Sequence, residues 1–365
     1  MTKICFLLGG FQGNGGIGRV TSILINQLCQ DHGLEIHTIS YLQDQRPMLY
    51  DVKPAVHTHV LYTAPCSMTK AMVFHHAIHK VRAILMEEEI DLLIACGALY
   101  YPLAIMACKK TKAKSICWEH TNPATSSDYK FQNLCRRYAV GKCSHFVVLT
   151  KSAEQYYKQH FPACKNKITQ IYNPIAEGVA RSKQYNSDSR KIISVGRLSY
   201  PKNFERLISI AARILPQYPD WLWDIYGDGE LKDSLQGLID KNKLGAQLTL
   251  KGQVTDLYDR YSKYAFMVMT SRYEGFPMSL IEGAANRLPL ISFDISTGPN
   301  EIISDGKNGY LVDPASDDYI VERIQNLIEN PTLRSAMSEE AYRTKDAYAI
   351  ERILEQWNNL FKELK

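Results

Sequence analysis

Short apolar runs alternate with helical stretches along nearly the whole chain, and this alternation restricts the fold more than any other feature. Such short runs are typical of buried strands, and the stretches of about ten to twenty residues between them have helical length. Buried strands joined by helices form parallel sheets that are covered on both faces. We therefore predict an α/β fold of doubly wound, Rossmann-like sheets, with strands at Ile4–Gly9, Glu35–Ser40, His57–Tyr62, Leu92–Cys96, Ser115–Glu119, His145–Leu149, Ile168–Tyr172, Lys191–Val195, Leu222–Tyr226, Leu248–Leu250, Phe266–Thr270, Leu290–Phe293 and Tyr310–Val312.

The length of 365 residues predicts two domains, because single hydrophobic cores stop growing at roughly 250–300 residues. A polar stretch follows Asn173-Pro174 and provides the best linker. We predict an N-terminal domain over residues 1–174, a linker over 175–190 and a C-terminal domain over 191–348. Ligands of doubly wound folds bind outside the carboxyl ends of the strands, so we expect the site in a cleft between the two domains.

The composition is that of an ordinary globular protein, with 45% hydrophobic and 22% charged residues. No run approaches the length of a membrane span, and the N-terminal apolar stretch is too short for a signal peptide, which predicts a cytoplasmic location. The nine cysteines lie between Cys5 and Cys164 without C-x-x-C pairs. We expect reduced thiols, several of them in the core, and neither a zinc site nor a disulfide framework.

Positive charge is concentrated in the first half of the chain. Residues 1–175 hold 19 Lys and Arg against 11 Asp and Glu, residues 176–365 hold 24 against 27, and the net charges of +8 and −3 sum to +5. Basic clusters lie at Lys109–Lys114 and Arg136-Arg137, and an amphipathic helix is expected over Met68–Met86. Such stretches suit peripheral contact with an anionic membrane surface, although a solvated helix face gives the same pattern. Nucleic acid is disfavoured as a partner, because no aromatic stacking set accompanies the basic residues.

Two glutamates lie eight residues apart in Ser271–Glu282, between a strand end and a helix start. Gly275 permits a sharp turn, and Pro277 suits the first turn of a helix, where its missing N–H costs nothing. Free N–H groups at that helix start can receive an anion or a polyhydroxylated ligand. Two solvated surface glutamates are the plainer interpretation, but this context favours a site in which Glu274 and Glu282 accept hydrogen bonds from different hydroxyls of one sugar.

A second strand-end turn carries two cations. A buried strand over Lys191–Val195 is followed by a glycine turn and by a helix that opens near Asn203, and Arg197 and Lys202 flank the turn. A guanidinium can grip phosphate oxygens in a fork while an ammonium adds a point charge, so the pair can converge on one doubly charged group. The context between strand and helix predicts a phosphate site. Tyr226–Glu230 is a further turn of this kind, either structural or part of a nucleotide pocket.

A glycine-rich turn follows the first strand, over Gly9–Arg19. Its glycines let the backbone approach a ligand closely. The spacing of Gly13, Gly15 and Gly18 matches a dinucleotide motif, so a nicotinamide-dependent oxidoreductase stays open as an alternative, although no acidic residue ends the second strand. His120 ends another strand, and we expect it to contact the substrate in the same cleft.

In their order and spacing these elements resemble glycosyltransferase family 4, the retaining GT-B glycosyltransferases, over nearly the whole chain. The matching elements are Gly15-Gly16-Ile17-Gly18-Arg19, His120, Ile171–Pro174, Val195–Arg197 with Lys202-Asn203, Gly227–Gly229, Gly252–Val254 with Asp256, Glu274–Glu282 and Asp305–Val312. The resemblance implies the GT-B architecture, in which the first domain binds the acceptor and the second the nucleotide sugar. It also implies that a C-terminal helix within residues 349–365 crosses back to the first domain.

The resemblance also assigns roles to residues. It implies that Arg197 and Lys202 bind the nucleotide diphosphate, that Glu282 binds the ribose, and that Glu274 holds the donor sugar. The implied catalytic residues are His120, Arg197, Lys202 and Glu274. The implied donor-binding residues are Gly16, Arg197, Lys202, Gly227, Gln253, Val254, Glu274, Gly275, Phe276, Pro277 and Glu282. The implied acceptor-binding residues are Gly15, Gly16, Arg19 and His120.

The reaction that the resemblance implies is transfer of a hexose or N-acetylhexosamine, with retention, to a glycan or a polyprenyl-diphosphate-linked saccharide. Gly298-Pro299 replaces the family's commoner paired glycines and resembles enzymes of cell-surface polysaccharide assembly, such as lipopolysaccharide or capsule, that use UDP-sugars, while GDP-mannose stays open. Such enzymes work at the inner face of the cell membrane. The cationic pair and helix N-termini can stabilise the leaving diphosphate, and the chain has no D-x-D triplet. We therefore expect no metal and no cofactor beyond the nucleotide sugar.

Three alternatives differ from glycosyl transfer in what they do with a sugar ligand. A nonhydrolysing UDP-sugar epimerase shares the two-domain architecture and would convert a UDP-sugar without an acceptor. A pair of carboxylates also serves glycoside hydrolysis, but the resemblance assigns these carboxylates to sugar hydroxyls. A non-catalytic nucleotide-sugar-binding protein would bind a donor without turnover, and the intact set of Arg197, Lys202, Glu274 and Glu282 argues against it.

Overall fold

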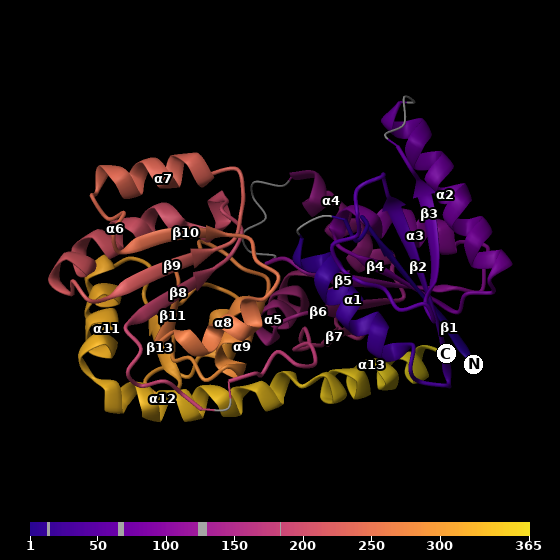
Figure 1. Cartoon of the computed structure of the whole chain (residues 1–365). Helices are drawn as coiled ribbons and strands as arrows, with labels where there is room; N and C mark the ends of the chain where they lie inside the picture. The colour runs from indigo at the N-terminus through magenta and orange to yellow at the C-terminus, as the bar shows by residue number, and fades with distance from the viewer. Residues whose placement is uncertain (13–14, 65–68, 123–129, 183) are drawn as a thin grey trace. The chain divides into compact units, whose positions relative to one another are not determined.

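The structure, a computed structural model, describes residues 1–12, 15–64, 69–122, 130–182 and 184–365, and it divides into two compact units (Figure 1). Unit 1 consists of Met1–Pro174 together with Ile350–Lys365, and unit 2 consists of Ile175–Ala349. Each unit is built on one parallel sheet with helices on both faces, which confirms the predicted fold class. Every predicted strand coincides with a strand of the structure, with ends that shift by up to two residues.

Unit 1 contains a seven-stranded sheet in the order β3-β2-β1-β4-β5-β6-β7. All its pairings are parallel. The strands are β1 (Thr2–Leu8), β2 (Leu34–Leu42), β3 (His57–Tyr62), β4 (Leu92–Cys96), β5 (Lys114–Glu119), β6 (His145–Val148) and β7 (Ile168–Gln170). The helices are α1 (Gly16–Leu28), α2 (Lys70–Glu87), α3 (Tyr101–Cys108), α4 (Lys130–Lys142), α5 (Lys151–His160) and α13 (Ile350–Leu364).

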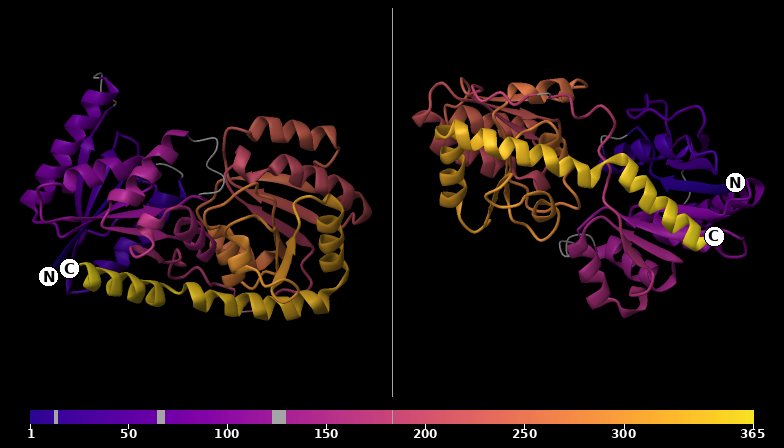
Figure 2. Two further views of the ribbon diagram at one scale, coloured as in Figure 1. Left: turned by 180° about the vertical axis from the view of Figure 1, so that it is seen from behind. Right: turned by 90° about the horizontal axis from the view of Figure 1, so that it is seen from below.

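The two faces of the unit 1 sheet carry different helices. Alternate strand residues such as Cys5 and Leu7 share one core with apolar side chains of α2, α3, α4 and α5. On the opposite face, Trp357 of α13 meets Trp118 of β5 edge-on, with ring centroids 5.1 Å apart, and α13 also packs against α1. Lys114 Nζ donates a hydrogen bond to the backbone oxygen of Leu364. The last helix is therefore an integral part of unit 1, where both chain ends lie (Figure 2).

Unit 2 contains a six-stranded sheet in the order β10-β9-β8-β11-β12-β13, again with parallel pairing throughout. The strands are β8 (Lys191–Val195), β9 (Leu222–Tyr226), β10 (Leu248–Gly252), β11 (Phe266–Met269), β12 (Leu290–Phe293) and β13 (Gly309–Val312). The helices are α6 (Phe204–Ile214), α7 (Lys232–Lys241), α8 (Leu257–Arg260), α9 (Met278–Ala285), α10 (Pro299–Ile302), α11 (Asp317–Glu329) and α12 (Pro331–Thr344). Helices α6, α7 and α11 share a core with one face of the sheet, and α9 packs against the other.

The predicted linker over 175–190 is not a free connection, because its described residues are anchored on unit 2. Asn286, which is buried, accepts hydrogen bonds from the backbone N–H groups of Arg181 and Ser182. Tyr185 donates to the backbone oxygen of Ala265 at 2.6 Å. Backbone N–H groups and the Tyr185 side chain thus hold this segment to unit 2; Lys183 lies outside the described residues.

Several cations of the first half do not form a free basic surface. Lys80 of α2 donates to the backbone oxygen of Leu61 at 2.7 Å, and Arg82 donates to that of Met106 at 2.7 Å. Arg136 is buried. Met68, the expected start of this helix, lies outside the described residues, and α2 begins at Lys70.

Among the described residues, no helix combines the length and the apolar character that crossing a bilayer requires.

The eight cysteines that the structure describes are free thiols, and seven of them are buried. Burial raises the pKa of Cys96 and of Cys108 to about 12. These thiols therefore stay protonated and unreactive at neutral pH. Cys66 lies outside the described residues.

Candidate active site

The strand order of each unit reverses at one point, and the candidate residues gather there. In unit 2 the chain leaves β8 toward one side of the sheet and leaves β11 toward the other, because β8 and β11 are neighbours in the order. The loops after neighbouring strands at such a switch point diverge and leave a crevice at the carboxyl edge, where ligands of doubly wound sheets bind. The loop after β8 carries Arg197 and Lys202, and the loop after β11 carries Glu274.

The turns after β8 and β9 are in backbone contact. Gly196 donates its N–H to the backbone oxygen of Tyr226 at 2.9 Å. Gly227 has a φ of +135°, and a Cβ at this position would lie 1.9 Å from the Gly196 oxygen. Only glycine fits there. Gly227 donates in turn to Gly252 at 2.9 Å, so the turns after β8, β9 and β10 line one edge of the sheet.

Lys202 and Glu274 form an ion pair across the switch point. The Lys202 Nζ lies 2.5 Å from the Glu274 Oε1, and the two side chains are 22% and 11% exposed. Ser271 Oγ donates to the same carboxylate oxygen at 2.7 Å, and the Lys202 stem lies over Gly196. Asn203, with a left-handed φ of 57°, ends the turn and opens α6. Two candidates that are 72 positions apart in sequence are thus directly bonded.

Arg197 is paired with a residue that the sequence did not single out. Its guanidinium lies 3.1 Å from the carboxylate of Glu230, and the two side chains are 63% and 54% exposed. Glu230 belongs to the turn after β9, which the sequence left as either structural or part of a nucleotide pocket. Because the pair is exposed, it contributes little to stability and can exchange partners readily.

The loop from Glu274 to Pro277 is held by a second glycine. Gly298 has a φ of +102°, and a Cβ there would lie 2.6 Å from the Pro277 ring. Thr297 Oγ1 donates to the backbone oxygen of Glu274 at 2.6 Å. Phe276 is buried against Tyr348, with ring centroids 5.4 Å apart. The segment after β12 therefore fixes the backbone of the glutamate loop.

Four further donor candidates have different surroundings. Glu282 lies inside α9, is 2% exposed, and accepts a hydrogen bond from the Tyr261 hydroxyl at 3.4 Å. Pro277 is the residue immediately before α9 rather than part of its first turn. Gln253 and Val254 directly follow β10, and Gln253 is exposed.

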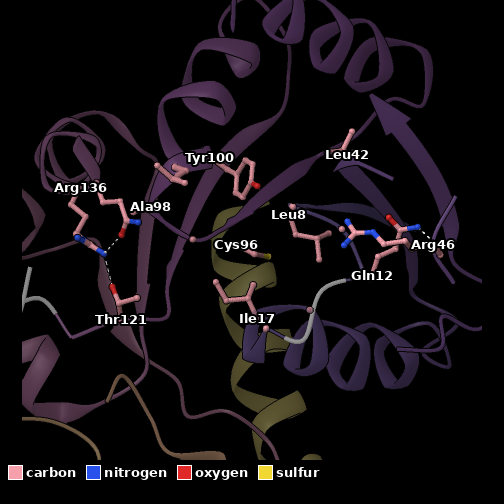
Figure 3. A pocket seen from close by; sticks show the side chains of 17 residues that line it. Leu8, Gln12, Ile17, Leu42, Arg46, Cys96, Ala98, Tyr100, Thr121 and Arg136 are labelled. Atoms are coloured by element: carbon pink, nitrogen blue, oxygen red, sulfur yellow. Dashed lines mark hydrogen bonds between the residues drawn. The ribbon is translucent and has the colours of Figure 1, made fainter. Parts of the chain in front are cut away.

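The switch point of unit 1 lies between β1 and β4 and contains a cavity of about 440 Å³. This volume suits a small-molecule ligand. Figure 3 shows Arg136 and Arg46 at opposite sides of the cavity, with Leu8, Ile17 and Cys96 between them. The walls are mostly apolar and glycine-rich, and the lining residues are Leu8, Gly9, Gly10, Gln12, Gly15, Ile17, Gly18, Leu42, Arg46, Cys96, Gly97, Ala98, Leu99, Tyr100, Thr121, Gln132 and Arg136.

The predicted acceptor residues are only partly in this cavity. Gly15 lines it, Gly16 is the first residue of α1, and Arg19 lies one turn further along that helix. Gly13, which completed the dinucleotide spacing, lies outside the described residues. His120 follows β5 and does not line the cavity.

His120 occupies an apolar environment. Its ring centroid lies 4.3 Å from that of Trp118, and its Nε2 is buried without a hydrogen-bond partner among the described residues. Burial lowers the pKa of His120 to about 3. The imidazole is therefore neutral near pH 7, which excludes a charged imidazolium as its resting form.

A buried ion pair at the cavity wall escaped the sequence analysis. Arg136 Nε donates to Glu119 Oε2 at 2.7 Å, and the two side chains are 5% and 1% exposed. Thr121 donates its hydroxyl to the other Glu119 oxygen at 2.6 Å and accepts a hydrogen bond from Arg136. Gln132 also accepts from Arg136. Of the predicted basic cluster, Arg136 is therefore buried. The sequence feature that could have indicated this ion pair is Glu119, a charged residue at the end of a buried strand.

Two Rossmann-like units in one chain, each with candidate binding residues at its switch point, define the GT-B class. Comparison with known proteins agrees. The family model described as Glycosyltransferase Family 4 matches residues 14–177, and that described as Glycosyl transferases group 1 matches residues 179–344. The chain belongs to this family of GT-B glycosyltransferases, as its resemblance implied.

Individual relatives extend over most of the chain. It is 29% identical over 366 residues to the amylovoran biosynthesis glycosyltransferase AmsD of Erwinia amylovora, with 99% of each chain covered. It is 30% identical over 293 residues to an uncharacterized glycosyltransferase of Methanocaldococcus jannaschii, with 68% of this chain and 72% of the relative covered. A crystal structure of a mutant of S. aureus TarM in complex with Fondaparinux, alpha-GlcNAc-glycerol and UDP has a TM-score of 0.83 at 16% identity, with 99% and 100% covered. At this low identity, the similarity to the TarM structure shows the fold alone.

Proposed function

We propose that this glycosyltransferase moves a hexose or N-acetylhexosamine from a UDP-sugar, with retention of configuration, to a saccharide acceptor in cell-surface polysaccharide biosynthesis. The observation that carries the donor site is the 2.5 Å ion pair between Lys202 and Glu274 at the switch point of unit 2. The pair brings an ammonium and a carboxylate into direct contact, and these two groups would bind a phosphate and a sugar hydroxyl of one nucleotide sugar.

Lys202 and Arg197 would bind the diphosphate. Breaking the bond between the anomeric carbon and the phosphate oxygen leaves a nucleoside diphosphate with new negative charge, and fixed cations stabilise that charge. Lys202 is 22% exposed and held by Gly196 and Glu274, whereas Arg197 is 63% exposed. Lys202 is therefore the better-positioned cation, and Arg197 would join after exchanging Glu230 for phosphate.

The carboxylates would bind hydroxyl groups. Glu274 has one oxygen on Lys202 and Ser271, and its backbone is fixed by Thr297. A sugar hydroxyl would donate to it while the lysine turns to the phosphate. Glu282 would accept from the ribose, and Gln253 and Val254 would border the base. Because Glu282 is 2% exposed, its contact with the ribose would require the ligand to enter beside α9.

The acceptor would use the cavity of unit 1, which Gly15 lines, and Gly16, Arg19 and His120 would contact the parts of the acceptor outside it. The new bond forms between an acceptor oxygen and the anomeric carbon on the face that the diphosphate leaves, and a departing phosphate oxygen takes the acceptor proton. A neutral His120 can donate or accept a hydrogen bond to the acceptor but brings no charge. We expect this reaction to need no metal, since the cations of unit 2 serve the leaving group. A lipid-linked acceptor at the inner membrane face belongs to the same proposal.

The relatives support the choice of donor and pathway. AmsD is named for amylovoran biosynthesis, and the TarM structure contains UDP together with alpha-GlcNAc-glycerol. The departure at Gly298-Pro299, which fixes the glutamate loop, is the feature of the chain itself that favours a UDP-sugar over GDP-mannose.

The test begins with thermal unfolding of the purified chain in the presence of UDP, GDP, ADP and their sugars, because a ligand that binds the folded state raises its Tm. The donor that stabilises most is then incubated with candidate saccharides, with and without EDTA, and the anomeric configuration of the product is read by NMR. We expect a UDP-sugar to stabilise most and to give an α-linked product in EDTA. Conversion of the UDP-sugar to its epimer without an acceptor would establish the epimerase instead. Binding without any turnover would establish the non-catalytic alternative.

A further inference from the structure

Imidazole and carboxylate side chains form a cluster at the amino ends of β2 and β3, at the opposite edge of the unit 1 sheet from the cavity. His37 of β2 lies opposite His57 of β3 in the parallel ladder. Glu35 precedes His37 by two residues on the same strand. Because side chains two apart on a strand share a face, all three project to the same side of the sheet.

The three side chains are close enough to share one ion. One oxygen or nitrogen from each of Glu35, His37 and His57 lies within 4.8 Å of the other two. The Glu35 Oε1 is 2.9 Å from the His37 Nε2. The His37 and His57 rings stack with centroids 4.7 Å apart and planes 21° apart. Among the described residues, no other group of three metal-ligating side chains meets in this way.

Zinc is the ion that this donor set suits best. Tetrahedral Zn²⁺ takes His nitrogens and carboxylate oxygens at about 2.0–2.2 Å, which separates the ligand atoms by roughly 3.4 Å. Small side-chain rotations bring atoms within 4.8 Å to that spacing, since paired strands hold the backbones in place. We propose that Glu35, His37 and His57 bind one Zn²⁺ ion, with water as the fourth ligand.

The surroundings of His37 support this assignment. A metal-binding imidazole usually has a partner on its other ring nitrogen, which fixes the ring orientation. The His37 Nδ1 lies 3.3 Å from the His59 Nε2, and the His59 Nε2 is 3.9 Å from Glu88. The His37 side chain is fully buried, whereas His57 is exposed. The cluster therefore has one fixed interior ligand and one ligand that solvent and an ion can reach.

The location indicates a structural role for the ion. Strand β3 is the edge of the sheet, and half of its residues are exposed. A bond from His57 to an ion held by Glu35 and His37 would tie this edge strand to β2. The cavity and the glycine-rich turn lie at the carboxyl ends of the same sheet, so the ion takes no part in the proposed transfer reaction.

Zinc binding by a second pair of histidines must be distinguished from binding by the cluster. His75 and His79 lie one turn apart on α2, with their Nε2 atoms 3.3 Å apart, and both are exposed. Two exposed imidazoles on a helix can also bind Zn²⁺, with lower affinity because they supply only two ligands. The double variant His75→Ala/His79→Ala is therefore the matched control.

The experiment uses the full chain without a histidine tag, stripped with EDTA and dialysed. Zn²⁺ binding is measured by competition with a chromophoric chelator, Co²⁺ is added separately to record its visible absorption, and Tm is followed with and without Zn²⁺. The variants are His57→Ala, Glu35→Gln and the control pair. His57 is exposed, so its replacement leaves the fold in place, which circular dichroism checks.

We expect one tight Zn²⁺ per chain, an intense Co²⁺ band typical of four-coordinate sites, and a rise in Tm. Loss of a ligand should weaken binding at least about 100-fold, since even loss of a supporting residue costs 10–100-fold. His57→Ala and Glu35→Gln should therefore abolish the tight site and the Tm rise, and the control pair should keep both. The proposal is overturned if the wild type binds no Zn²⁺ tightly, or if binding survives His57→Ala and Glu35→Gln and disappears in the control pair.

Discussion

Replacement of Lys202 by methionine tests the donor site most directly. Methionine keeps the length of the side chain and removes its charge, so the stem can still cover Gly196. The lysine is 22% exposed and its partner Glu274 is 11% exposed, so water screens the site only in part. Loss of one group that stabilises developing negative charge typically costs about 10²–10³ in rate, or about 2.7–4 kcal/mol.

The geometry allows this magnitude to be divided between the two cations. Arg197 is 63% exposed and its ion pair with Glu230 lies in solvent, so we expect Arg197→Met to cost about tenfold, near the value of a screened contact. Lys202→Met should cost about 10²-fold or more. The ratio of the two effects, rather than either alone, reports the difference in solvent screening that the structure shows.

The assay is the initial rate of nucleotide release with the donor and acceptor that the thermal and turnover screens identify, expressed as kcat/KM. Lys232→Met is the matched control, since Lys232 is an exposed lysine on α7 of the same unit. Loss of the ion pair should lower the free energy of unfolding by about 1–2 kcal/mol, between the values for exposed and buried pairs, so the variant stays folded. A Lys202→Met enzyme with kcat/KM within about threefold of the wild type would refute the assigned role.

Three further outcomes test the structure around the sites. Gly227→Ala should lower the free energy of unfolding by about 3 kcal/mol, because the new Cβ would meet a backbone oxygen at 1.9 Å, whereas Gly237→Ala, on the exposed face of α7 with nothing within 4 Å, should be neutral or stabilising by up to about 1 kcal/mol in urea titrations. Burial lowers the pKa of His120 to about 3, so the unfolded chain takes up a proton below about pH 6.5 that the folded chain refuses. Stability should accordingly fall as the pH drops from about 6.5 toward 3, and His120→Gln should flatten this fall in denaturant titrations at several pH values; parallel curves would disprove the buried, neutral imidazole. Arg136→Met should cost about 3–5 kcal/mol, because it leaves the Glu119 carboxylate buried without its cation, and adding Glu119→Gln should recover part of that loss; additive losses in the double variant would contradict a direct pair.

The fold and the candidate loops could be predicted because their signals are local. Each strand is a short apolar run, and the turn after each candidate strand carries glycines and charged residues within about ten positions of the strand end. Parallel connection then brings all strand ends of one unit to a single edge. That reasoning put Lys202 and Glu274 at the same edge although 72 positions separate them.

Side-chain partners could not be predicted, because they depend on which loops touch. Glu230 bonds Arg197 only because the turns after β8 and β9 are in backbone contact. The sequence indicated that Arg136 belongs to a basic surface cluster. Its burial depends on Glu119, which is 17 positions earlier. The polar residues of 175–190 suggested a linker for the same reason, because the segment is anchored by Asn286 at the end of α9, which accepts hydrogen bonds from the backbone N–H groups of Arg181 and Ser182.

The proposed zinc site could not be predicted from the sequence either. Cysteine spacing gave no sign of a metal site, because the proposed ligands are histidines and a glutamate that adjacent strands bring together. Within β2, Glu35 and His37 have the alternation of any strand, and His57 gains meaning only from its register opposite His37. A one-residue change of that register would turn His57 to the other face. Metal ligands that come from neighbouring parallel strands therefore depend on how the strands pair. The spacing of residues along the chain does not show this pairing.

The ion pair between Lys202 and Glu274 also bears on how the proposed donor would bind. A lone ammonium at 22% exposure would lose hydration without compensation, and a lone carboxylate at 11% would lose more. In the structure each satisfies the other, and Ser271 holds the carboxylate in place. A diphosphate that takes the lysine, together with a sugar hydroxyl that takes the glutamate, replaces one charged contact by two. Because Gly196 and Ser271 already restrict the two side chains, little rotamer entropy remains to be lost on binding. In the proposed binding mode, a diphosphate without its sugar would satisfy the lysine and leave the carboxylate with Ser271 alone, so the pair would favour the intact nucleotide sugar over the free nucleotide.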